Sequence, residues 1–176
     1  MKNDLINELA LTKADLLETL DQFSNHSINV IPFEDSWTAG QVAEHVFMSA
    51  SAVASALNGP VKAADRDPEQ HIQLFSQIFL NFDHKLKSPD FIIPSDEPKD
   101  KQALIDSLRE TFNSIEHSAN SGNLDMICTT FDMPTLGTLS REELIWFTTV
   151  HTQRHIHQLK NIAGELEKQN TNEIIQ

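Results

Sequence analysis

The chain has 176 residues and a formal net charge of −13, from 13 Lys and Arg against 26 Asp and Glu. This length suits one hydrophobic core, so residues 1–176 are predicted to form a single domain. The acidic balance and scattered basic residues argue against nucleic acid or an anionic membrane as a partner, and the lone Cys128 excludes an internal disulfide and a cysteine-based zinc cluster.

We expect no targeting signal in the N-terminal residues. They read MKNDLINELALTKADLLETL, which is charged and amphipathic and lacks the apolar core and cleavage site of a signal peptide. No apolar run in the chain approaches the roughly 20 residues of a membrane-spanning helix. We therefore expect a cytoplasmic protein with no membrane association.

Two helices are predicted in the first 60 residues. The first spans about residues 3–25, because its apolar residues recur at helical spacings and form one core-facing stripe. The second begins after Thr38, which forms a capping box with Gln41, and stops before Pro60. The stripe of the first helix consists of Leu5, Leu9, Leu16, Leu20 and Phe23.

Two more helices are expected in the middle of the chain. One starts at Pro68, where proline suits the first helical position, and runs to about Lys87. The segment SPDFIIPSDEP contains three prolines and is predicted to be a joint. The next helix spans about residues 99–119. The apolar stripes of these two helices are Ile72, Phe75, Phe79, Phe82 and Leu86, then Leu104, Leu108, Phe112 and Ile115.

The segment 121–140, SGNLDMICTTFDMPTLGTLS, is long for a connection between bundle helices. Two interpretations stay open, a loop that covers a site and a loop that contains a short helix. Ser140 and Glu143 then form the clearest capping box in the chain. The last helix is expected from Arg141 to about Gln169.

Five amphipathic helices without a convincing strand pattern predict an all-α fold. The expected architecture is a four-helix bundle with an extra or broken helix.

The last helix contains the unusual sequence HTQRHIHQ. His151 and His155 lie four residues apart, so they share one helix face and approach within about 6 Å. His157 points about 200° around the helix from His155 and is not part of the pair. The same face carries the apolar residues Leu144, Phe147, Leu159 and Ile162, so the two imidazoles are expected beside the core.

Two hypotheses explain histidines on an apolar stripe. They can be neutral core residues that hydrogen-bond to carbonyls or to each other, or they can bind a metal ion. A third ligand would favour the metal, and His45 in the second helix is the best candidate because Val42 and Val46 surround it. The remaining histidines are expected on the surface: His26, His71, His84 and His117.

Three imidazoles leave at least one coordination position open, which is typical of catalytic rather than structural zinc. Nickel, iron, cobalt and manganese also accept such ligands. An ion in an open site can activate water or hold a thiolate or carbonyl. HTQRH lacks the Glu that follows the first His in zinc peptidases, so peptidase action is disfavoured.

Other polar residues lie one turn from the histidines or beside them. Gln41 and Gln158 are predicted to orient the rings of His45 and His155 from outside the ligand set. Glu44 adjoins His45 and is a candidate base, although a solvated carboxylate is the alternative. Arg141 and Arg154 are candidate anion clamps or ordinary helix-surface residues. The sequence assigns no catalytic residue.

The motifs WTAGQVAEHV and HTQRHIHQL, together with MPTLGTLSREELIWF, resemble the DinB/YfiT-like superfamily of small metal-binding four-helix bundles. The resemblance spans nearly the whole chain and implies that His45, His151 and His155 are the metal ligands. It also implies zinc or nickel, a homodimer, and transfer or isomerisation reactions that use a low-molecular-weight thiol such as bacillithiol or mycothiol.

The sequence thus favours a metal-dependent, thiol-dependent transferase or hydrolase that acts on a small molecule. The alternative is a non-catalytic metal- or ligand-binding bundle with a role in stress. A third possibility, purely structural histidines, predicts no stoichiometric metal.

Overall fold

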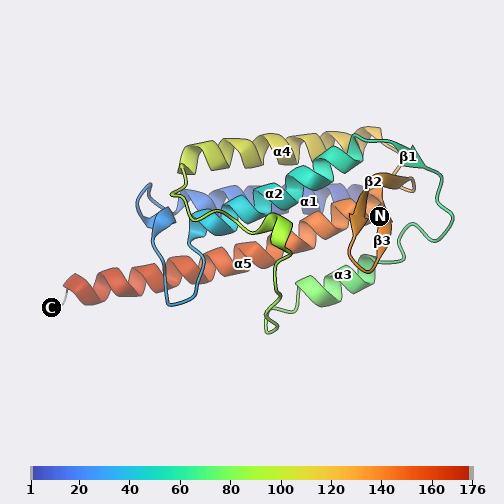
Figure 1. The fold of residues 1–176 in the computed structure, drawn as a ribbon. Helices are drawn as coiled ribbons and strands as arrows, with labels where there is room; N and C mark the ends of the chain where they lie inside the picture. The colour runs from blue at the N-terminus through green and yellow to red at the C-terminus, as the bar shows by residue number, and fades with distance from the viewer. Residues whose placement is uncertain (1, 175–176) are drawn as a thin grey trace.

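The computed structural model describes residues 2–174 and consists mainly of helices. Four long helices run side by side along one axis (Figure 1). A short fifth helix, α3, packs against α5. The helices are α1 (Lys2–Asp21), α2 (Ala39–Leu57), α3 (Ile72–Phe79), α4 (Lys101–Ser121) and α5 (Arg141–Ile174), with short 3₁₀ turns η1 (Ser27–Asn29) and η2 (Asp90–Ile92).

A small antiparallel sheet lies at the end of the bundle where α5 begins (Figure 1). Its strands are β1 (Val61–Lys62), β2 (Ile127–Met133) and β3 (Gly137–Ser140), in the order β1-β2-β3. The prediction of an all-α fold was therefore wrong in this part, and neither a loop nor a short helix occupies most of segment 121–140. The rest of the expected architecture, a mostly helical chain with four long helices, is present.

Local sequence explains the β2–β3 hairpin. Ile127, Thr129, Thr130 and Phe131 are β-branched or aromatic residues, which favour extended backbone. The turn that follows ends at Gly137, whose φ of 78° is one that glycine adopts without steric cost. This combination was the signal for a hairpin.

The predicted stripes of α1 and α4 lie in the core. All five residues of the α1 stripe are buried, and so are Leu108, Phe112 and Ile115 of α4. Helix α2 packs against both α4 and α5, and the small side chains of Ala43 and Ala50 are buried in it. These contacts fix α2 and α5 side by side, which positions the histidines that they carry.

Helix α3 is much shorter than predicted. It begins at Ile72, because the backbone N–H of His71 donates to the carboxylate of Glu143 (3.0 Å). It ends at Phe79, because the Arg154 guanidinium donates to the backbone carbonyls of Asn81 and His84 beyond that point. Phe82 and Leu86 are consequently exposed, although the sequence pattern placed both on a core stripe.

The first turn of α5 carries a buried carboxylate that the protein satisfies completely. Glu143 Oε2 accepts from Arg66 Nη2 (2.6 Å) and from the backbone N–H of Ser140 (2.8 Å). Oε1 accepts from Arg66 Nη1 (2.8 Å) and from His71 N–H. Ser140 Oγ in turn accepts from Glu143 N–H, so the predicted capping box is confirmed. We call Glu143, Arg66, Ser140 and His71 the Glu143 cluster.

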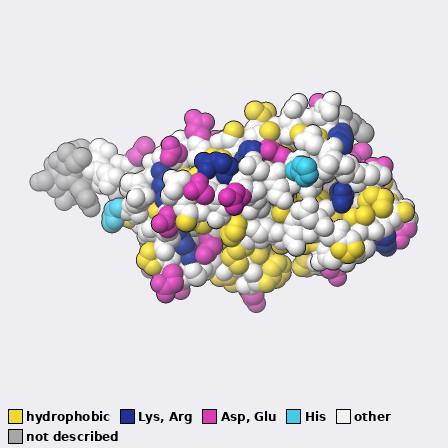
Figure 2. Space-filling model, turned by 90° about the horizontal axis from the view of Figure 1, so that it is seen from above, with side chains coloured by type: hydrophobic (Ala, Val, Ile, Leu, Met, Phe, Trp, Pro, Cys, Tyr) yellow, Lys and Arg dark blue, Asp and Glu magenta, His cyan; other side chains and the backbone are white. Residues whose placement is uncertain are grey.

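The surface combines scattered acidic side chains with apolar patches (Figure 2). The exposed large apolar residues fall largely on two segments, residues 31–33 and 74–93. Phe33 and Phe91 are 55% and 64% exposed. Within residues 2–174, no helix has the length and apolar character needed to cross a membrane.

Candidate metal centre

Helix α2 delivers His45 to the interior of the bundle. The helix begins with the predicted capping box, in which Thr38 Oγ1 accepts from Gln41 N–H and Gln41 Oε1 accepts from Thr38 N–H. His45 then lies on the buried face with Val42 and Val46, and its side chain is almost inaccessible to solvent.

Helix α5 delivers the other two imidazoles. His151 and His155 are both buried, as expected from their four-residue spacing on the stripe that faces the core. His157 is exposed and stacks on Phe82 at a centroid distance of 4.3 Å, so it takes no part in the cluster.

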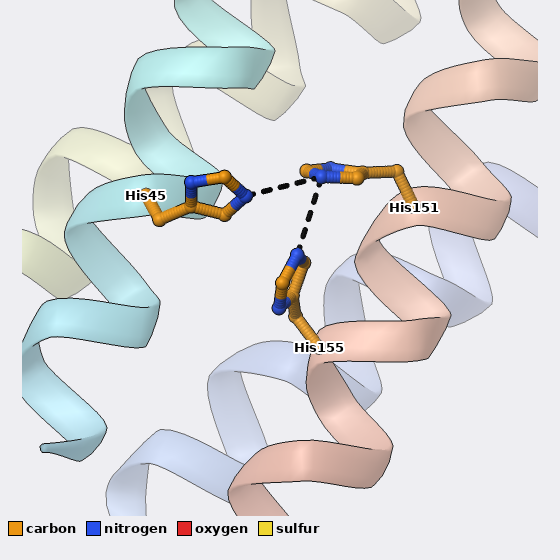
Figure 3. Close-up of side chains that lie close together, drawn as sticks. All are labelled: His45, His151 and His155. Atoms are coloured by element: carbon orange, nitrogen blue, oxygen red, sulfur yellow. Dashed lines mark hydrogen bonds between the residues drawn. The ribbon is translucent and has the colours of Figure 1, made fainter. Parts of the chain in front are cut away.

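The three rings point toward one another across the α2–α5 interface (Figure 3). His151 Nε2 lies 3.2 Å from His45 Nε2 and 3.2 Å from His155 Nε2. All three candidate ligand atoms lie within 4.8 Å of one another. Two nitrogens bound to one tetrahedral zinc ion at about 2.0–2.1 Å would be roughly 3.3 Å apart, so the spacing suits a shared ion. We call His45, His151 and His155 the histidine cluster.

The outer nitrogens of two rings already have partners. His45 Nδ1–H donates to the backbone carbonyl of Ile92 (2.8 Å), and Ser88 Oγ lies 3.3 Å from the same nitrogen. His155 Nδ1–H donates to Gln158 Oε1 (2.9 Å). Each bond places the ring hydrogen on Nδ1 and leaves Nε2 with a lone pair that faces the other histidines.

Burial keeps the imidazoles neutral. Burial, and after it the neighbouring His45, lowers the pKa of His155 to about 3. The pKa of His151 also lies well below its usual range, because of burial and then of His155 and His45. Burial likewise lowers the pKa of His45, against the opposing effect of its bond to Ile92. Neutral imidazole is the form that binds metal ions.

Hydrogen bonds among the three rings cannot satisfy all of the inner nitrogens. The Nε2 atoms of His45 and His155 are both acceptors, while His151 Nε2 carries at most one hydrogen and can donate to only one of them. The remaining lone pair is buried without a donor, which costs about 1–3 kcal/mol. A cation between the three nitrogens removes this mismatch, so the residues present fit a divalent metal ion.

One wall of a large cavity is formed by the histidine cluster. The cavity has a volume of about 740 Å³ and lies between α2, α5 and the segment from α3 to η2. Trp37, Phe79 and Phe147 line it and lie against the imidazoles, at ring centroid distances of 5.2 Å (Trp37 to His45), 5.5 Å (Phe79 to His151) and 5.2 Å (Phe147 to His151). A ligand in this cavity can reach the inner nitrogens.

Three other candidate residues lie elsewhere. Gln41 does not orient His45, because its amide bonds Thr38 and donates to the Ser95 carbonyl and Asp96. The Glu44 carboxylate accepts from Ser95 N–H and pairs with Lys99 (2.6 Å), so it is not a base at the cluster. Arg141 donates to the Leu57 carbonyl, away from the cavity.

Two features of the site were not predicted. Ile92 supplies the carbonyl that orients His45, in place of Gln41, and Arg154 donates to backbone carbonyls of residues 79, 81 and 84 along the cavity wall. Every residue has a backbone carbonyl, so residue types do not reveal which carbonyl accepts a hydrogen bond. The sequence therefore offered no signal for either contact. Of the two predicted outer glutamines, only Gln158 contacts the cluster.

Comparison with known proteins gives a match to a family model. A family model described as the DinB superfamily matches residues 8–159, a stretch that includes all three histidines. Searches of curated proteins and of solved structures gave no significant match. The family match covers far more than half of the chain, and the chain therefore belongs to the DinB superfamily.

Proposed function

We propose that this protein is a metal-dependent enzyme that transfers a low-molecular-weight thiol, or hydrolyses a small molecule, at the histidine cluster. The single observation that carries this proposal is the convergence of three neutral Nε2 atoms on the wall of a cavity. A structural metal site would be closed by four protein ligands, whereas three leave a position for a substrate. Zinc or nickel suits this all-nitrogen set.

When bound, the ion would lower the pKa of a water or thiol at its open position and so provide a nucleophile at neutral pH. The protein's own residues fix the ligands beforehand. The bond from His45 to Ile92 and the bond from His155 to Gln158 each hold a ring with Nε2 toward the cavity. The aromatic rings of Trp37, Phe79 and Phe147 limit the access of bulk water to the imidazoles.

The absence of a nearby carboxylate favours a thiol over water as the nucleophile. Among the described residues that line the cavity, Asp35 is the only carboxylate, and Glu44 is paired with Lys99. A free thiol has a pKa of about 8.5 and needs much less activation than water at about 15.7. At a site without a general base, a thiol is therefore easier to deprotonate than water, which favours thiol transfer over hydrolysis.

Cobalt substitution tests the open position. We expect N-acetylcysteine to change the visible absorption of the cobalt-loaded protein, because a thiolate that joins the ligands adds a charge-transfer band. The His117→Ala variant, altered at an exposed residue of α4 outside the cluster and outside the cavity, should respond in the same way, and His151→Ala should not hold cobalt. A cobalt spectrum that thiols and small anions leave unchanged would indicate a closed site and favour the non-catalytic binding bundle.

A thiol-transfer assay tests the reaction itself. The zinc-loaded or nickel-loaded protein is mixed with a low-molecular-weight thiol and an aromatic chloride activated by nitro groups. The thiol sulfur replaces chloride on the ring, so the thioether, the chloride and the proton released are measured. Turnover that disappears in His151→Ala and persists in His117→Ala, which lies outside the cavity, is expected. Equal rates with the wild type and His151→Ala would contradict catalysis at this cluster.

We also propose that the protein is cytoplasmic, and that it forms a homodimer, as the family resemblance implies. Sedimentation at several concentrations would measure the oligomeric state. A single species with the 19.8 kDa mass of one chain at all concentrations would overturn the dimer.

A further inference from the structure

The cavity beside the histidine cluster is rich in aromatic side chains. Six of the chain's ten phenylalanines line it, together with Trp37. Several of these rings are uncovered at its rim, where Phe33, Phe82 and Phe91 are 55%, 44% and 64% exposed. When a ligand covers apolar side chains that are exposed around a cavity, the removal of their surface from water lowers the free energy of the complex. The walls therefore fit a ligand with an apolar body.

The charges around the cavity are opposite to those of the chain as a whole. Its charged lining residues are Lys85, Lys87 and Arg154, against the single carboxylate of Asp35. The full sequence has 13 basic residues against 26 acidic ones. A local excess of positive charge on an acidic protein attracts an anion to this site in preference to the rest of the surface.

The three basic groups have different roles. Arg154 donates to the carbonyls of Asn81 and His84, so it holds the segment between α3 and η2 against α5. Lys85 and Lys87 lie on that segment, are exposed, and form no ion pair with any residue in 2–174. Their ammonium groups are consequently available to a ligand at the rim, while the histidines lie buried at the inner wall.

We propose that the cavity binds an amphipathic anion, whose acidic group lies between Lys85 and Lys87 at the rim and whose apolar body lies along the phenylalanines toward the histidine cluster. This proposal rests on the proposed function, because it names the substrate class of the same site. A strongly polar substrate would leave the aromatic walls uncovered, and a cationic one would face the two lysines.

Three ligands with the same ten-carbon chain separate the apolar and charged contributions. Decanoate, 1-decanol and decyltrimethylammonium are titrated calorimetrically, below the concentrations at which they form micelles, into metal-free and zinc-loaded protein. We expect decanoate to bind about 10-fold more tightly than decyltrimethylammonium, because two ligand–lysine pairs near the surface each contribute modestly. The alcohol should bind with intermediate affinity.

Paired variants locate the preference. Lys85→Gln with Lys87→Gln should remove most of the preference for decanoate and leave the affinity for decanol unchanged. Lys160→Gln with Lys168→Gln changes the net charge by the same amount on exposed residues of α5 outside the cavity, and should keep the preference. The double variant Phe82→Ala and Phe91→Ala should bind all three ligands more weakly, by a similar factor.

Other outcomes would overturn the proposal. Equal affinities for the three ligands would show that the lysines do not select an anion. A preference that appears only with zinc would place the acidic group on the metal instead of at the rim. An unchanged preference in the Lys85 and Lys87 variant would show that these lysines do not hold the acidic group. The titration of metal-free protein separates this test from the test of the proposed function. If decanoate binds as expected but the protein takes up no metal, the proposed function fails and the proposal of an amphipathic anion stands.

Discussion

Helix α5 carries two buried polar clusters that differ in whether the protein completes them. The Glu143 cluster lies in its first turn, and the histidine cluster begins eight residues later, about 12 Å along the helix. Glu143 accepts four hydrogen bonds, two of them from Arg66, with which it also forms an ion pair, so both carboxylate oxygens are satisfied. The histidine cluster has three inner nitrogens and at most one hydrogen among them.

This difference in hydrogen bonding distinguishes a structural cluster from a candidate binding site. A buried charge with complete partners holds segments of the chain in place, and Glu143 joins the start of α3, the end of β3 and the first turn of α5. A buried set of lone pairs costs stability until something binds to it. We infer that a bound ion removes that cost, which makes the histidine cluster the candidate site and Glu143 a structural residue.

The largest expected effect is on stability, at the completed cluster. Glu143→Ala should lower the free energy of unfolding by about 3–5 kcal/mol, because it leaves the Arg66 guanidinium and two backbone N–H groups without their acceptor. Urea denaturation measures the loss. Glu165→Ala, which removes an exposed pair with Lys168, should change the free energy by at most about 0.5 kcal/mol. Similar losses in the two variants would remove the distinction.

Zinc should stabilise the protein through the histidine cluster alone. At a free zinc concentration of about 100 times the dissociation constant, the free energy of unfolding should rise by roughly 2.7 kcal/mol. The same increment is expected in Glu143→Gln, because sites more than about 7–10 Å apart act additively, and none is expected in His151→Ala. Denaturation with and without zinc gives the three increments. A reduced increment in Glu143→Gln would show that the two clusters are coupled.

The outer bond of His155 should have a smaller effect. Gln158→Ala removes the acceptor of His155 Nδ1–H and should weaken zinc binding about 10–100-fold. The matched control is Gln153→Ala on the same helix, whose amide bonds Glu8 and Thr12 of α1 instead. Competition with a coloured chelator measures both affinities, and equal affinities would mean that Gln158 does not orient the ring.

The smallest expected effect depends on pH and concerns Glu142, next to the completed cluster. Burial raises the pKa of Glu142, and the carboxylates of Glu69 and Asp125 raise it further. The folded state therefore binds this proton more tightly, so stability from this group is present at low pH and is lost as pH rises through the folded pKa. Glu142→Gln should gain a few tenths of a kcal/mol over the wild type at neutral pH. The gain should vanish below the ordinary pKa of glutamate, and a gain that is independent of pH would contradict this cause.

Local patterns were enough to predict the helices that carry the site. Both capping boxes depend on residues three apart, and the histidine pair on residues four apart, so neither needs knowledge of the tertiary fold. His45 joined them because it lies on an apolar face of α2, which the fold places beside α5. The prediction of three histidines that lie close together therefore needed only helix geometry and one packing assumption.

The segments outside the long helices depend on distant partners, and there sequence reasoning failed. Helix α3 is shorter than predicted at both ends, because Glu143 accepts from the backbone before it and Arg154 donates to the backbone after it. Both residues lie far from α3 in the chain. The β2–β3 hairpin had a local signal in Ile127, Thr129 and Phe131, but its pairing with β1 depends on how the chain returns to Val61. The apolar pattern is helical in most of the chain, so this short extended pattern was not interpreted as a hairpin.

Metal content per chain is the most direct test of the central claim. The protein is purified without an affinity tag, reconstituted with zinc or nickel, and analysed for bound elements beside the triple variant His45→Ala, His151→Ala and His155→Ala and beside His157→Ala. We expect about one ion per chain in the wild type and in His157→Ala, and none in the triple variant. A wild-type protein that takes up no ion, or a triple variant that retains one, would contradict the assignment of the histidine cluster as a metal site.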